Sequence, residues 1–227
     1  MKKTTKYIIG GILIIAVAVI SWLLLDNNGS SNKKDNGINS HMENVQDPNL
    51  QNYLKEQDAI MDSMMKDMEN IPKTGDTALD FLYGMIPHHE SAIAMSESLL
   101  EYGGENTEIK QIAENIIKDQ AIENEDMKKM IKELEENPQV DEAKENAYLE
   151  DYNKMLQEPM SHDMSTPKSV DEAYTEGMIM HHEMAVDMSE TILKHTENEM
   201  IKKMAQDIIE KQNKEITEMK ILLESMK

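Results

Sequence analysis

Apolar residues recur along most of the chain at intervals of three and four positions, a spacing that places them on one face of an α-helix. The alternation that marks a half-buried strand is absent from the sequence, so the pattern predicts an all-α protein. Turn residues interrupt the pattern at four places: Pro72–Gly75, Gly103–Gly104, Asn137–Pro138 and Pro159–Pro167.

The same helical unit is written twice. The segment Gly84–Glu90 recurs as Gly177–Glu183, and eleven of the seventeen residues that begin at these two glycines are identical. Further matching blocks lie on either side: Ala113–Lys128 with Ala205–Lys220, and more weakly Tyr53–Met65 with Tyr148–Met160. The domain is therefore a tandem duplication, with repeats at about residues 48–137 and 141–227.

Each repeat is expected to hold one short helix and two long ones. Two long helical hairpins with short turns predict a four-helix bundle, with the short helices added to it. Ser169 and Glu172 form a capping-box pattern ahead of the first long helix of the second repeat.

Residues 1–25 differ in composition from the rest of the chain. Three lysines precede the uncharged segment Tyr7–Leu25, which as a helix would span about 28 Å, close to the hydrocarbon core of a bilayer. Because lysines favour the cytoplasmic side, we predict a single-pass transmembrane signal-anchor with the C-terminal domain outside the cytoplasm. A cleaved signal peptide, which would give a secreted protein, is the alternative.

Residues 26–47 are rich in Asn, Ser, Gly and Lys and almost free of apolar residues. This composition predicts a flexible linker between the anchor and the duplicated domain at 48–227.

The composition narrows the range of functions. The 227 residues include 44 acidic and 23 basic ones, for a net charge of −21, which repels nucleic acid and leaves cations as suitable partners. Because the chain has no cysteine, disulfides, thiolate metal sites and thiol nucleophiles are excluded. The unusual feature is the 21 methionines.

Polar residues on the core-facing stripes are the candidate functional residues. Folding the first hairpin about its turn places His88 level with Gln120, beside Glu123. The second hairpin repeats this arrangement with His181, Gln212 and Glu215. Adjacent histidines point about 100° apart on a helix, so one of His88 and His89 is expected to face the core. The other would reach a short helix or solvent, and the same holds for His181 and His182. A buried hydrogen bond that merely fixes helix register is the structural alternative.

Imidazole and thioether together form a soft ligand set. This set favours Cu(I), with Ag(I) as its mimic, over Mg, Ca or Mn, and another transition metal is the alternative. Thioethers also suit an exported protein, because thiols oxidise outside the cytoplasm. A further candidate set, Met160, His162 and Met164, lies in a proline-bounded loop where helix packing does not explain methionine. Packing alone explains the spacing of most other methionines. For Met61, Met64, Met65 and Met68, a further metal site and a plain apolar helix face fit the spacing equally well.

The repeated Gly-Met-Ile-Pro-His-His-Glu block and the Ala-x-x-Ile-Ile-x-x-Gln-x-x-Glu block that follows it resemble the ferritin-like family catalogued as domain of unknown function 305. The resemblance covers about residues 48–227 and implies a ferritin-like helical bundle, usually exported. Some members of the family are similar to periplasmic copper-binding proteins linked to copper resistance. The metal-binding candidates that it implies are Met85, His88, His89, Met95, Gln120, Glu123, Met127, Met178, His181, His182, Met188, Gln212, Glu215 and Met219.

The second repeat has Met180 in place of Pro87 and Met184 in place of Ser91, so it is richer in sulfur. The two predicted sites, one in each repeat, are therefore expected to differ in affinity.

The leading hypothesis is a membrane-tethered, extracytoplasmic protein that binds Cu(I) for sequestration, tolerance or delivery. A metal-free helical module that binds an envelope protein is the main alternative. A di-iron oxidoreductase is less favoured, because the core-facing positions hold Gln-x-x-Glu instead of the Glu-x-x-His of di-iron bundles. The sequence shows no catalytic constellation, so we do not expect an enzyme.

Overall fold

The computed structural model describes residues 45–158 and 166–226, all within one compact unit, Gly37–Lys227. These residues form six helices and no strand, which confirms the predicted all-α class. The helices are α2 (Pro48–Glu69), α3 (Thr77–Tyr102), α4 (Thr107–Glu136), α5 (Glu142–Gln157), α6 (Val170–His195) and α7 (Glu199–Met226).

Several predictions fall on residues that the structure does not describe. They are the anchor at 1–25, the linker up to residue 44, and the loop set Met160, His162 and Met164. Among the described helices, none has the length and apolar character needed to cross a bilayer.

The helices begin and end where their terminal residues satisfy the backbone. Asp47 caps α2 just before Pro48, and Asp76 caps α3 by accepting a hydrogen bond from the backbone N–H of Ala78 at 2.9 Å. Gly103 ends α3 with φ of 82°, a left-handed conformation that favours glycine.

The predicted capping box at the start of α6 forms in part. The Ser169 hydroxyl accepts a hydrogen bond from the backbone N–H of Glu172 at 3.1 Å, as expected. The Glu172 carboxylate, however, accepts from the N–H of Lys168 at 2.6 Å, one residue before the expected Ser169 donor.

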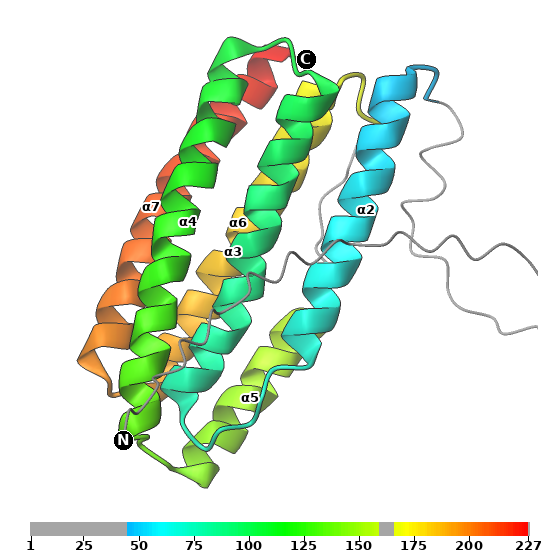
Figure 1. The fold of residues 1–227 in the computed structure, drawn as a ribbon. Coiled ribbons are helices and arrows are strands. Elements are labelled where there is room, and N and C mark those ends of the chain that lie inside the picture. The colour runs from blue at the N-terminus through cyan, green and yellow to red at the C-terminus, as the bar shows by residue number, and fades with distance from the viewer. Residues whose placement is uncertain (1–44, 159–165, 227) are drawn as a thin grey trace, which may run out of the picture. The chain divides into compact units, whose positions relative to one another are not determined.

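The two repeats pack through their first long helices. In Figure 1, α3 and α6 lie at the centre, α4 flanks α3 and α7 flanks α6. Helix α2 packs along α3 and α6, and α5 packs mainly against α6. Two long hairpins with added helices were predicted, but α2, with 22 residues, is nearly as long as the 26-residue α3.

A polar layer divides the core into two apolar clusters. The Phe81 cluster contains Phe81 and Met85 of α3, Met127 of α4, Met188 of α6 and Ile208 of α7, among others. The Tyr174 cluster contains Ala92 and Met95 of α3, Ile116 of α4, Tyr174 and Met178 of α6, and Met219 of α7, among others. Along each of the four long helices, the histidines, glutamines and glutamates of the motif lie between the two clusters.

Tyr152 ties α5 to the rest of the bundle. Its hydroxyl donates a hydrogen bond to the backbone carbonyl of Met68, at the end of α2, at 3.1 Å. The same hydroxyl lies over Gly84 of α3, where a Cβ would approach it to 2.8 Å. The close approach explains why this helical position accepts glycine, which has no side chain.

Candidate metal centre

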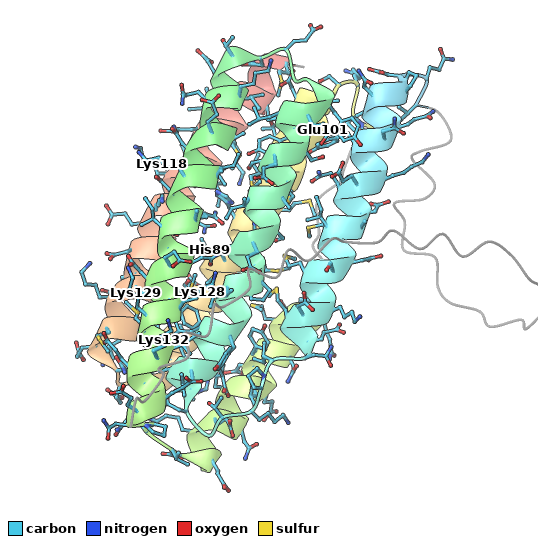
Figure 2. All side chains as sticks on the ribbon, viewed as in Figure 1. His89, Glu101, Lys118, Lys128, Lys129 and Lys132 are labelled. Carbon is cyan, nitrogen blue, oxygen red and sulfur yellow. The ribbon has the colours of Figure 1, made fainter. Side chains whose placement is uncertain are left out.

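Four histidines meet at the middle of the bundle. His88 and His89 lie on α3, His181 and His182 lie on α6, and all four are 0% exposed. Figure 2 shows His89 about midway along the bundle, among the side chains between α3 and α4. We call these four residues the histidine layer.

The first histidine of each pair faces its counterpart in the other repeat. The ring centroids of His88 and His181 are 3.8 Å apart, and the ring planes are inclined by 37°. The sequence analysis placed His88 and His181 level with Gln120 and Gln212 of their own hairpins, but it did not predict this contact between the repeats. The reason is that α3 and α6 pack directly against each other, so residues facing that contact meet across the repeats.

The second histidine of each pair faces the second long helix of its own hairpin. The Nε2 atom of His89 lies 2.8 Å from the Glu123 carboxylate of α4, and Nε2 of His182 lies 2.7 Å from the Glu215 carboxylate of α7. The predicted meeting of His and Glu in each hairpin is thus confirmed, although through His89 and His182. The prediction that the other member of each pair would reach a short helix or solvent was wrong, because His88 and His181 are buried against each other between the long helices α3 and α6.

Most of the remaining ring nitrogens have no partner among the described residues. They are both ring nitrogens of His88 and the Nδ1 atoms of His89, His181 and His182. An unsatisfied buried polar atom typically costs about 1–3 kcal/mol. A neutral imidazole can bind a metal ion through its one unprotonated nitrogen, so the layer has the chemical character of a ligand set.

His181 has one contact that His88 lacks. Its Nε2 atom lies 2.6 Å from the hydroxyl of Ser91 on α3, and that hydroxyl is 2.9 Å from the thioether sulfur of Met64 on α2. Helix α2 therefore brings a methionine to the edge of the histidine layer. Neither Ser91 nor Met64 was among the predicted ligands. The exchange of Ser91 for Met184 between the repeats is a sequence signal for the Ser91 position, but it gives none for Met64.

Burial lowers the pKa of His88 and of His181 well below the usual value for imidazole, and the neighbouring histidines lower it further. Both rings are therefore neutral near pH 7. A neutral imidazole has a free lone pair and is the form that binds metals.

The two carboxylates of the layer have different surroundings. Burial raises the pKa of Glu123, but the hydrogen bonds and charges of His89 and Lys211 outweigh burial and lower this pKa to about 2. The Lys211 ammonium of α7 lies 2.7 Å from Glu123 and 3.1 Å from Asp119. Lys211 of the second repeat corresponds to Asp119 of the first repeat. The first repeat therefore offers Glu215 no lysine to match the one that Glu123 receives from the second repeat.

The predicted methionine ligands border the layer instead of lying within it. Met85, Met127 and Met188 belong to the Phe81 cluster, whereas Met95, Met178 and Met219 belong to the Tyr174 cluster. Each is at most 2% exposed. Gln120 and Gln212 lie at the level of the layer, are 2% exposed, and leave their Oε1 atoms without a partner in the described structure.

The histidines and carboxylates of the layer contact one another in pairs. Within the ranges 45–158 and 166–226, no three His, Asp or Glu side chains are grouped so that they alone would hold a metal ion. Further ligands for the histidines would therefore come from the thioethers that border the layer.

The fold and the site together define a class: all-α proteins in which two copies of a helical unit place paired histidines at the centre of one bundle. The chain belongs to the family described as Domain of unknown function (DUF305), whose model matches residues 25–131 and again residues 76–223. The predicted family membership is confirmed.

Solved structures of the protein CopM are similar to this chain. CopM in the Cu(II)-bound form is 30% identical, with a TM-score of 0.50, over 66% of this chain and 97% of CopM. CopM in an Ag-bound form obtained by soaking is also 30% identical, with a TM-score of 0.49, over 65% and 96% of the two chains.

A curated relative covers less of the chain. Uncharacterized protein L153 of Acanthamoeba polyphaga mimivirus is 46% identical over 57 residues, which are 25% of this chain and 38% of that protein.

Proposed function

We propose that this protein binds copper in the histidine layer and that it sequesters or delivers the metal outside the cytoplasm. The observation that carries the proposal is the set of buried, unpartnered ring nitrogens contributed by both repeats. The similarity to CopM in its Cu(II)-bound form supports copper as the metal.

His88 and His181 would supply the first two ligands of one shared ion. Their rings are in contact across the two repeats, which favours one shared ion over a separate ion in each repeat. His89 and His182, whose Nε2 atoms are held by Glu123 and Glu215, are the candidates for a third ligand through their unpartnered Nδ1 atoms. Their rings would have to move toward the ion, because no three histidine or carboxylate side chains of the described residues are grouped to hold one. Carboxylates in such positions orient imidazole ligands and increase their basicity.

The methionines that border the layer favour the monovalent ion. Thioether sulfur is a soft ligand that selects Cu(I), and Ag(I) has the same preference. We therefore propose Cu(I) as the bound state. We also propose a binding role and not a catalytic one, with residues 1–25 as the anchor that holds the domain at the outer face of the membrane.

The test is a competition titration of the full-length protein with Cu(I) and a chelator of known affinity, without oxygen. The double variant His88→Gln/His181→Gln keeps polar side chains in the layer but removes both imidazoles. We expect it to weaken binding by more than the 10–100-fold typical of losing an outer-shell partner. His195→Gln is the matched control, because His195 bonds Asp151 at the surface, away from the layer. Equal affinity in the folded double variant and the wild type would contradict the histidine layer as the binding site. A wild type that shows no measurable Cu(I) binding would favour a metal-free module.

A further inference from the structure

A second group of methionines lies outside the histidine layer, in a groove between α4 and α7. The groove has a volume of about 330 Å³. Its lining includes four thioethers, Met127 and Met130 from α4 and Met200 and Met204 from α7. Of these four, only Met127 was a predicted ligand.

The spacing of the methionines brings both pairs into the groove. Met127 and Met130 are three residues apart and Met200 and Met204 are four apart, so each pair shares one face of its helix. Met127 is 0% exposed at the base, Met130 and Met204 are partly buried, and Met200 is 42% exposed. The thioethers therefore extend from the core to the surface, where an ion from solvent can reach them.

Three carboxylates line the groove, and each has a lysine partner. Glu123 pairs with Lys211, Asp126 with Lys129 and Asp207 with Lys203. A thioether is uncharged, so a monovalent ion bound by methionines keeps its charge. Nearby carboxylates compensate that charge without having to ligate the ion.

Comparison of the repeats shows that packing does not require these thioethers. The positions of the other repeat that correspond to Met130, Met204 and Met200 hold Leu222, Ile112 and Glu108. Branched aliphatic residues thus meet the packing requirement at the related place, and an exposed acidic residue replaces Met200. Only Met127 has a methionine counterpart, Met219.

We propose that the groove between α4 and α7 is a separate thioether site that binds one Cu(I) or Ag(I) ion. Methionine sulfur selects soft monovalent ions over the hard divalent ions that carboxylates alone would attract. The groove shares Glu123 and Met127 with the border of the histidine layer, but its three outer thioethers, Met130, Met200 and Met204, belong to side chains outside the layer.

The test uses substitutions taken from the protein's own repeat. The triple variant Met130→Leu/Met200→Leu/Met204→Ile removes the three outer thioethers while keeping apolar volume. Anaerobic Cu(I) titration of the full-length protein should show one bound equivalent fewer in the triple variant than in the wild type. The control Met155→Leu, a partly buried methionine of α5, should keep the full number.

Two further measurements separate this proposal from that for the histidine layer. The variant His88→Gln/His181→Gln should retain the equivalent bound in the groove. Ag(I) should also slow oxidation of Met200 and Met204 by hydrogen peroxide, followed by peptide mass spectrometry, in that same variant. A folded triple variant that binds as many equivalents as the wild type would overturn the proposal, as would unchanged oxidation of both methionines in the presence of Ag(I).

Discussion

The rings of His88 and His181, which come from the two repeats, lie with their centroids 3.8 Å apart at the centre of the bundle. Because each repeat contributes one ring, neither repeat alone holds the pair. The duplication thus creates one central site out of two copies of a motif. Both rings are fully buried, and three of their four nitrogens have no hydrogen-bond partner in the described structure.

Metal binding to this pair should stabilise the fold. An ion that binds only the folded state adds about 2.7 kcal/mol at a free concentration of 100 times Kd. Thermal unfolding of the full-length protein should therefore move to higher temperature with Ag(I), and the shift should be at least halved in His88→Gln/His181→Gln. An equal shift in the two proteins would place the stabilising ion elsewhere.

Without metal, the layer should make the fold sensitive to mild acid. The folded-state pKa of His88 and of His181 is lowered, so below about pH 6.5 the unfolded chain takes up protons that the folded chain does not. Stability is therefore lost as pH falls below that value, by about 1.4 kcal/mol per histidine between pH 7.5 and 5.5. Urea unfolding at these two pH values should show a loss in the wild type that exceeds the loss in His88→Gln/His181→Gln. Equal losses would show that the two rings do not carry this sensitivity.

Lys211 should oppose metal binding at the side of the layer formed by the first repeat. Its ammonium lies 2.7 Å from Glu123, the carboxylate that also contacts His89. A fixed positive charge near the layer repels a bound cation. We expect Lys211→Gln to tighten Cu(I) binding by about two- to tenfold, a size typical of a partly screened charge.

The control for that experiment is Lys214→Gln, which removes a lysine of α7 that is 77% exposed. This substitution should leave the affinity unchanged. If the two variants bind Cu(I) equally, the ammonium beside Glu123 has no specific effect.

The equivalent glycines of the two repeats should respond differently to alanine. A Cβ at Gly84 would lie 2.8 Å from the Tyr152 hydroxyl, whereas at Gly177 the nearest atom is the Met95 methyl group at 3.5 Å, an ordinary contact. Gly177→Ala should stabilise the protein by up to about 1 kcal/mol through helix propensity. Gly84→Ala meets overpacking that typically costs about 1–3 kcal/mol, so it should be the less stable of the two. Equal unfolding midpoints in urea would contradict this difference.

The helices and their pairing within each hairpin were predictable from the sequence because they depend on local periodicity and on a recognisable internal repeat. The pattern around Met85, His88, Ala92 and Met95 places these residues on one face, and all four are buried. The close contact of His89 with Glu123 follows from the hairpin, since the two residues lie on consecutive helices joined by a short turn.

The contact between His88 and His181 was not predictable in the same way. It depends on how the two hairpins dock against each other. Folding each hairpin about its turn predicts which residues of one hairpin lie at the same level, but it contains no information about that docking. The same reason explains why Ser91 and Met64 were missed as neighbours of His181: they come from α3 and α2, outside its own hairpin. Lys211 was missed because its contact with Glu123 joins α7 of one repeat to α4 of the other.

The most direct test of a shared ion is the stoichiometry of single histidine variants. The full-length protein that carries Met130→Leu/Met200→Leu/Met204→Ile is titrated anaerobically with Cu(I), alone and with either His88→Gln or His181→Gln added. If His88 and His181 share one ion, each single variant should lose one tightly bound Cu(I) ion, and the double variant should lose no more than that one. If they form two independent sites, the number of ions lost in the double variant should be the sum of the numbers lost in the two single variants. A single variant that still binds its ion tightly, or a double variant that loses two ions, would contradict the account.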